Sequence, residues 1–279
     1  MQLASDDGLG SDYKIYENNI DLNKTIGEDI ENELEKIDGV KNVYPVKSYI
    51  GEVLIEKNNF FWKEYYEYLN EAYKDTYNGY MRNTINGDYA IKCNILGYND
   101  ELLGKMEPYI LEGSIDPDQM RRNNEIVLVT LEDAQGNHNS VDKKIGDTIK
   151  VRIPNNIGGT SEDLKQLGSE SDFSEKEYTI SAIVSRTMVR DSRLYTLEDQ
   201  PDITYSVIMT NEQMQKNYNI EAYRVLTVEK EKSADTELVA AEIKRRTQTL
   251  DDCLFQDYTG AIAVSYTHLR AHETLSDLV

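Results

Sequence analysis

Apolar residues in this chain occur in runs no longer than a single β-strand. The longest runs are "EIVLVTL" at 125–131 and "YSVIM" at 205–209. A helix that crosses a membrane needs about 20 apolar residues in succession, and no stretch of the sequence approaches that length. Short apolar runs bounded by turn residues are typical of buried strands. The sequence therefore favours a fold built around a sheet, with helices where apolar residues recur at helical spacing.

The clearest helical spacing lies near the start of the chain, in "TIGEDIENELEKIDGV" at 25–40. One apolar stripe runs along this segment and consists of Ile26, Ile30, Leu34 and Ile37. Acidic residues fill the first turns, where the helix dipole favours them, and Gly39 stands where a left-handed C-terminal cap is expected. Segments 11–21 and 40–56 predict strands on either side, the second bent at Pro45, so a strand–helix–strand unit is expected.

A second helix-bearing unit is predicted at the end of the chain. A short helix should follow Thr210, whose side chain suits an N-cap, and a longer one should span "ADTELVAAEIKRRTQTL" at 234–250. In the longer helix Leu238, Ala241 and Ile243 lie near one face, which we expect to be buried. Three strands should alternate with these helices, at 202–210, 221–231 and 251–263.

The middle of the chain predicts a strand-rich region. Four segments there have the composition of strands: "DYAIKCNILGY", "EIVLVTL", "TIKVRIP" and "KEYTISAIV". The stretch at 113–124 contains Gly and Pro and is expected to be a loop, and the Gly- and Ser-rich stretch at 157–175 is expected to be a flexible hairpin or loop.

Segment 58–81, "NNFFWKEYYEYLNEAYKDTYNGYM", holds the only Trp and a high density of Tyr. Its aromatic and apolar residues recur at helical spacing through Phe61, Tyr65, Leu69, Ala72 or Tyr73, Tyr77 and Tyr80. One interpretation is an amphipathic helix that packs on the sheet. The other is a partly exposed aromatic face for a partner or an amphiphile, because Tyr and Trp suit surfaces with one wet edge. The candidate residues for such a face are Phe61, Trp62, Tyr65, Tyr68, Tyr73 and Tyr77.

Composition excludes some partners. The chain carries 51 acidic and 30 basic residues, for a net charge of -21. Such a charge repels nucleic-acid phosphates and gains nothing from anionic lipid headgroups. The two cysteines, Cys93 and Cys253, do not amount to a disulfide framework, and we expect two separate thiols.

Few residues suit catalysis. His138 stands in the turn-rich "DAQGNHNS" with no partner nearby in sequence, and no nucleophile elbow, phosphate-binding loop or dinucleotide fingerprint is present. Acidic pairs such as Asp116 and Asp118 carry little information in so acidic a chain, and "DPDQMRRNNE" lacks the spacing of a calcium loop. No enzyme activity, cofactor or metal is therefore expected, although a hydrolase would re-enter consideration if the fold brought a buried carboxylate pair into a cleft.

The last stretch, "AVSYTHLRAHETLSDLV", suggests a metal site on residue chemistry alone. His268 and His272 are four residues apart, on one face of a helix, with Glu273 beside them. Residues 264–279 nevertheless resemble one reading frame of a transposase sequencing adapter, whose constant bases also account for Asp277 to Val279. We therefore expect the native chain to be interrupted near Ile262 and this stretch to hold no site.

An ordered set of phrases in the rest of the chain is similar to one protein family. "IENELEKIDGVKNVYPV" is followed in order by "YILEGSI" with Leu111, Gly113 and Ser114, by "EIVLV", by "KKIGDTIKV" with Gly146, and by "YTISAIV". This set resembles the extracytoplasmic core domain of FtsX/MacB-type ABC transporter permeases, over about residues 25–262. The sequence departs from the family pattern at Ala182, where the family often has Gly.

The resemblance implies an α+β fold, with a porter-like α/β subdomain formed by both ends of the chain and an inserted β-rich subdomain. The implied segments are 11–57 (first porter-like segment), 58–88 (Tyr-rich helical insertion), 89–200 (inserted β-rich subdomain), 201–262 (second porter-like segment) and 263–279 (adapter-derived tail).

The implied function is that of a non-enzymatic domain fragment of an ABC transporter permease. It would act in export or mechanotransmission of an amphiphilic substrate such as a lipoprotein, peptide or antibiotic. Its partners would be its own membrane helices and a cytoplasmic ATPase subunit, in a dimeric permease at the extracytoplasmic face of the cell membrane. The alternative is a secreted or surface-anchored binding protein unrelated to a transporter.

Overall fold

A computed structural model describes residues 12–17, 26–57, 60, 63–72, 80–84, 86–130, 138, 142–155, 173–191, 193–194, 206–250, 253–257 and 259. Within these residues, eleven strands join one sheet. The strands are β1 (Tyr13–Glu17), β2 (Val40–Ile55), β3 (Met81–Asn83), β4 (Tyr89–Tyr98), β5 (Ile110–Gly113), β6 (Glu125–Thr130), β7 (Thr148–Pro154), β8 (Phe173–Ser185), β9 (Ser206–Thr210), β10 (Val225–Lys230) and β11 (Cys253–Asp257). The α-helices are α1 (Glu28–Glu35), α2 (Lys63–Ala72), α3 (Asp100–Gly104), α4 (Pro117–Asn123), α6 (Asn211–Tyr218) and α7 (Thr236–Thr247). Two short 3-10 helices span Glu107–Tyr109 and Arg186–Arg190.

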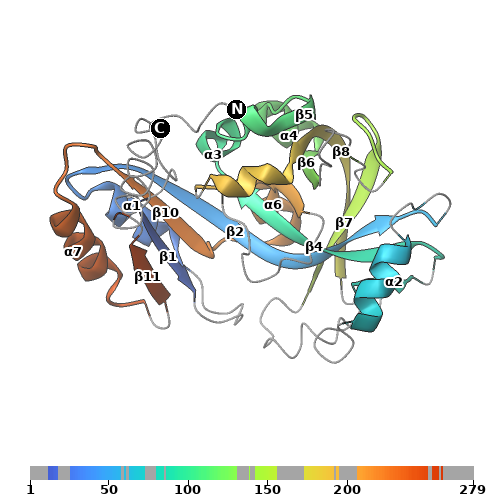
Figure 1. Ribbon diagram of the computed structural model, residues 1–279, viewed down its shortest axis with the longest axis horizontal. Coiled ribbons are helices and arrows are strands. Elements are labelled where there is room, and N and C mark those ends of the chain that lie inside the picture. The colour runs from blue at the N-terminus through green and yellow to red at the C-terminus, as the bar shows by residue number, and fades with distance from the viewer. Residues whose placement is uncertain are drawn as a thin grey trace, which may run out of the picture.

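The two ends of the chain meet in what we call the terminal part of the sheet (Figure 1). There β1 lies between β10 and β11, antiparallel to both, and β10 pairs with the first half of β2. Helices α1 and α7 pack together on this part. Their apolar side chains and those of the strands form one core, which includes Tyr13, Ile15, Leu34, Val43, Leu226 and Ile243.

The second half of β2 enters what we call the central part of the sheet, where it pairs with β4 and β7. From β7 the order runs through β8, β6 and β9 to β4 and β3. The β6–β8 and β4–β9 pairs are parallel, and the other pairs are antiparallel. Two apolar cores pack here, one containing Tyr66, Ile91 and Val151, the other containing Tyr98, Leu102 and Val127.

Each strand expected from the sequence is present in the described residues, and the fold is mixed α/β. The expected boundaries between subdomains remain predictions. In the structure β9 and α6, at residues 206–218, lie against β4 and β6, whereas β10, α7 and β11 lie in the terminal part.

All four residues of the expected stripe are buried, but the helix is shorter than expected, so only Ile30 and Leu34 belong to it while Ile26 and Ile37 flank it. It ends at Glu35, with Lys36 as a right-handed C-cap. Gly39 is therefore not the cap. Its φ of 91° serves the turn into β2, where a Cβ would meet the side chain of Ala234 at 2.7 Å.

The prediction of the buried face of α7 is partly wrong, because the buried face is rotated around the helix by about one residue from the predicted one. Leu238 is 68% exposed, and the buried side chains are those of Val239, Ala240, Ile243 and Thr247. Leu238 precedes Ile243 by five residues, which places it about 140° away around the helix. The Asp235 side chain accepts hydrogen bonds from the N–H groups of Glu237 and Leu238 and so fixes where this helix begins.

Helix α4 occupies part of the stretch at 113–124 that the sequence predicted to be a loop, and helix α3 was not predicted from the sequence. Helix α4 begins after Asp116, whose carboxylate accepts the N–H of Gln119 at 3.0 Å, and Pro117 fills its first position. Helix α3 begins after Asn99, whose side chain accepts the N–H of Leu102 at 2.9 Å. Both stretches carry ordinary N-terminal signals that outweigh their turn-like composition.

Candidate functional site

Residues 63–72 of the aromatic segment form helix α2, which packs on the edge of the central part (Figure 1). Helix α2 buries Tyr66 and Leu69. The ring of Tyr66 lies 5.8 Å from that of Phe60, which in turn lies 5.8 Å from that of Tyr89. The Asn70 amide donates to the carbonyl of Met81 at 2.8 Å and accepts its N–H at 3.2 Å, so it ties the helix to β3.

The two described candidate residues of this segment differ in exposure. Tyr68 is 66% exposed. Tyr65 is partly buried, and its ring meets that of Tyr66 edge-on at 5.7 Å. Phe61, Trp62, Tyr73 and Tyr77 lie outside the described residues. The proposed partner-facing role of this segment therefore remains a prediction, for which Tyr68 is the described side chain most open to solvent.

The expected helical stripe was only partly correct. Leu69 is buried as expected, but its inward neighbour is Tyr66, three residues earlier, a position that the stripe did not include. Tyr80 is buried, directly precedes β3 and is not part of α2. The i, i+3 spacing of Tyr66 and Leu69 was the signal that could have identified the buried face.

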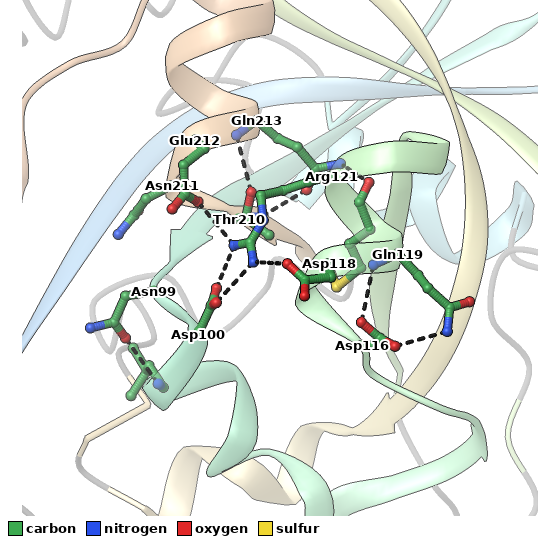
Figure 2. A network of polar contacts seen from close by, with 12 residues as sticks. Asn99, Asp100, Asp116, Asp118, Gln119, Arg121, Thr210, Asn211, Glu212 and Gln213 are labelled. Atoms are coloured by element: carbon green, nitrogen blue, oxygen red, sulfur yellow. Dashed lines mark hydrogen bonds and ion pairs between the residues drawn. The ribbon is translucent and has the colours of Figure 1, made fainter.

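A polar network joins the three short helices of the central part (Figure 2). Arg121 of α4 donates two hydrogen bonds to Asp100 of α3, at 2.5 and 2.9 Å, and one to Asp118 at 2.7 Å. The carboxylate of Glu212 on α6 lies 3.5 Å from the same guanidinium. The hydrogen bonds that the guanidinium donates to Asp100 and Asp118 raise the pKa of Arg121. One cation thus holds three carboxylates from three helices.

The base of this network is buried. Thr210 and Gln213 form a capping box at the start of α6, in which each side chain bonds the other's N–H. The Gln213 amide also donates to the carbonyls of Met120 and Glu125, both at 2.9 Å. The network therefore fixes α6 against the end of α4 and the start of β6, and its contacts are those of a structural joint.

A second charged group lies between the strands of the central part. Glu52 is almost fully buried and accepts hydrogen bonds from Arg82 at 2.8 and 2.9 Å and from Arg152 at 2.7 Å. The Phe173 ring lies over both guanidinium groups, at 5.5 and 4.6 Å. Lys92 stands opposite Glu52 in the β2–β4 register, and burial lowers its pKa to about 8. The carboxylate is engaged by cations, so it is not the unpartnered pair that a hydrolase would need.

The described residues contain no cluster of three His, Cys, Asp or Glu side chains suited to a metal. His138 lies 3.3 Å from the carboxylate of Glu112, and the histidines of the tail lie outside the described residues. Cys93 is buried and Cys253 partly buried, and the two thiols are not joined by a disulfide, as the sequence predicted. Burial raises the pKa of the Cys93 thiol.

None of the described helices combines the length and apolar character that crossing a bilayer requires.

Comparison with known proteins rests on the fold. No protein-family model matches the chain, and no curated protein matches it at a significant level. Among solved structures, the periplasmic region of MacB from Actinobacillus actinomycetemcomitans matches with a TM-score of 0.52 and 10% identity, over 93% of this chain and 94% of that one. The extracellular domain of the noncanonic ABC-type transporter YknZ from Gram-positive bacteria matches with a TM-score of 0.48 and 8% identity, over 89% and 100%. A permease-protein domain from Porphyromonas gingivalis matches with a TM-score of 0.42 and 13% identity, over 88% and 87%.

The described elements thus define a mixed α/β domain whose two ends meet in one part of a continuous sheet. The particular fold is that of the MacB periplasmic region, which the chain matches over nearly its whole length. The match confirms the expected periplasmic-domain fold, whereas its division into a porter-like and an inserted β-rich subdomain stays a prediction.

Proposed function

We propose that this chain is an extracytoplasmic domain of an ABC transporter permease and that it acts without catalysing a reaction. The observation that carries the proposal is the match to the MacB periplasmic region over 93% of the chain. Sequence phrases in the order typical of such domains lead to the same family independently of the fold.

The pairing of the end strands agrees with this role. A domain inserted between two membrane helices must return its chain to the place where it left, because both helices begin at the same membrane surface. Strands β1 and β11 are antiparallel neighbours, and Tyr13 pairs with Asp257. The first and last described strands thus begin and end side by side, as such an insertion requires.

In the proposed protein, membrane helices flank the domain and a cytoplasmic ATPase subunit drives its motion through them. The working unit is a dimeric permease at the extracytoplasmic face of the cell membrane. The domain then transmits motion to an amphiphilic substrate, such as a lipoprotein, peptide or antibiotic, or handles it directly. The aromatic residues of segment 58–81 are the proposed contact for that substrate or for a partner.

The alternative is a secreted or surface-anchored binding protein with no transporter. Both proposals share the fold, so the sequence of the uninterrupted locus distinguishes them. A segment of about 20 apolar residues soon after Ile262 supports the permease. A stop codon or a cell-wall anchor at that point overturns it in favour of the binding protein.

A further inference from the structure

Strand β2 passes from the terminal part to the central part of the sheet at a single residue. It pairs with β10 from Val40 to Val46 and with β4 from Val46 to Ile55. Only Val46 belongs to both of these ladders. Figure 1 shows β2 running from the group that contains α7 and β11 into the group that contains β4 and β7. Among the described strands, no partner of β2 runs past Val46, so no single ladder bridges the two halves of β2 and resists bending between them.

The chain returns to the terminal part through residues 219–224, and this second connection lies against the same point of β2. The N–H of Arg224 donates to the carbonyl of Val46 at 2.8 Å. Tyr223 exchanges two backbone hydrogen bonds with Ile26, both at 2.9 Å, next to the start of α1. The two connections between the terminal and central parts that the structure describes therefore meet at Val46, and we call this place the junction.

Lys47 links the groups that meet at the junction. Its side chain is 3% exposed, and its ammonium donates to the carbonyls of Asn211 at 3.2 Å and Ile220 at 2.8 Å. Asn211 begins α6 in the central part, and Ile220 belongs to the returning connection. The Asn211 amide in turn donates to the carbonyl of Pro45 at 3.3 Å. The ammonium also lies 5.7 Å from the centre of the Tyr223 ring.

The charges around Lys47 come from both parts of the sheet. Burial lowers the pKa of its ammonium, whereas the carboxylates of Glu212, Glu221, Glu28 and Glu31 raise it. Glu28 and Glu31 lie on α1 in the terminal part, and Glu212 lies on α6 in the central part. A buried ammonium is retained only where hydrogen bonds and opposite charges offset its loss of hydration. The groups that provide this compensation belong to elements that would separate if the junction bent.

We propose that the junction is a hinge between the terminal and central parts and that Lys47 sets its stiffness. The side chain restrains bending by holding β2, the start of α6 and the returning connection together. This inference concerns the domain alone and does not depend on a role in transport. In a permease, the same hinge would determine how far motion of the terminal part reaches the central part.

The test compares Lys47→Met with Lys92→Met. Both lysines are 3% exposed, and methionine keeps most of the length of the side chain while it removes the charge. Spin labels are attached at Glu35→Cys on α1 and Lys176→Cys on β8, both exposed, in a Cys253→Ser background. Pulsed electron resonance then measures the distribution of distances between the two parts. We expect Lys47→Met to broaden this distribution and Lys92→Met to leave it unchanged.

Hydrogen exchange measures the same change without labels. Loss of two charged hydrogen bonds should speed exchange of the amides at 220–224 by roughly 10-fold or more, with exchange in β6 and β8 unchanged. If Lys47→Met does not fold, Asn211→Ala replaces it, since that variant removes only the bond to Pro45. An unchanged distance distribution, or equal broadening in Lys92→Met, overturns the proposal. So does exchange that rises uniformly across the sheet, because Lys47 then contributes only to overall stability.

Discussion

Neutralising Glu52 should be among the most destabilising single changes in the described residues. Its carboxylate accepts three hydrogen bonds from Arg82 and Arg152, at 2.7 to 2.9 Å, and stands opposite Lys92. Glu52→Gln keeps the size of the side chain but removes the charge that these cations share. Breaking a buried ion pair from one side costs about 3–5 kcal/mol, because it leaves charge in the interior without compensation. A domain with a total stability of about 5–15 kcal/mol would lose a large fraction of it.

The assay is urea unfolding at pH 7, followed by far-ultraviolet circular dichroism, with Glu242→Gln as the matched control. Glu242 also accepts a paired set of bonds from an arginine, Arg245, but on the exposed surface of α7, where solvent screens the pair. We expect a large fall in the midpoint for Glu52→Gln and almost none for the control. Equal midpoints for the two variants would refute the reasoning that burial determines the strength of the Glu52 group.

A double variant separates the charge from the packing. In Glu52→Met/Arg152→Met both buried charges of the closest pair are absent, and Arg82 is exposed enough to turn towards solvent. The double variant should therefore lose less stability than the sum of the two single variants, by about 0.5–3 kcal/mol. Simple additivity would show that the two side chains are not coupled through their ion pair.

Three further outcomes follow from the geometry. The pKa of Lys92 in the folded state, about 8, lies below its value in the unfolded chain, so the unfolded chain binds more protons between about pH 8 and 10. The free energy of unfolding of the wild type, measured by urea titration at each pH, should therefore rise over that range relative to that of Lys92→Met. Tyr68→Ala should change the free energy of unfolding by less than about 0.5 kcal/mol, whereas Tyr66→Ala should lower it by about 3–5 kcal/mol. Reduced transport by a Tyr68→Ala permease would therefore reflect a lost contact, and unchanged transport would remove Tyr68 from the proposed partner-facing surface. Gly113→Ala should lower the melting temperature more than Gly146→Ala, since both have positive φ but only at Gly113 would a Cβ meet a backbone oxygen, that of Ser181, at 2.1 Å.

Local signals predicted the elements well where one physical preference dominated. The stripe of α1 and the N-cap of α6 at Thr210 were both correct, because periodic apolar spacing and a capping side chain act within a few residues. The start of α4 was equally readable from Asp116 and Pro117, but Pro117 was taken together with Gly113 as a sign of a loop. The face of α7 was misjudged because Leu238 is apolar yet lies outside the buried stripe.

The charged interior could not be predicted in the same way. Lys47 and Glu52 stand in a long strand, where single charges ordinarily mark the solvent face. They are buried because distant elements cover them: Arg152 lies 100 residues from Glu52 in sequence, and Ile220 lies 173 residues from Lys47. Spacing within one strand contains no information about such partners. The candidate site was limited for the same reason, since the exposure of Tyr65 and Tyr68 depends on how α2 packs on the sheet.

Two of the family phrases, "YILEGSI" and "KKIGDTIKV", meet on the strand formed by a third, "YTISAIV" in β8. Gly113 ends β5, and the N–H of the next residue, Ser114, donates to the carbonyl of Ser181 in β8 at 3.1 Å. The N–H of Gly146 donates to the carbonyl of Ile180 at 2.9 Å, and Asp147 accepts the N–H of Ile180 through its own carbonyl at 3.0 Å. Three short phrases, weak when taken singly, thus describe one set of backbone bonds around "YTISAIV". Glycine is needed at Gly113 because the backbone of β8 leaves no room for a Cβ. These phrases thus correspond to strands and turns that contact one another in the fold. For this reason the ordered set predicted the fold even though the nearly full-length match is only 10% identical in sequence.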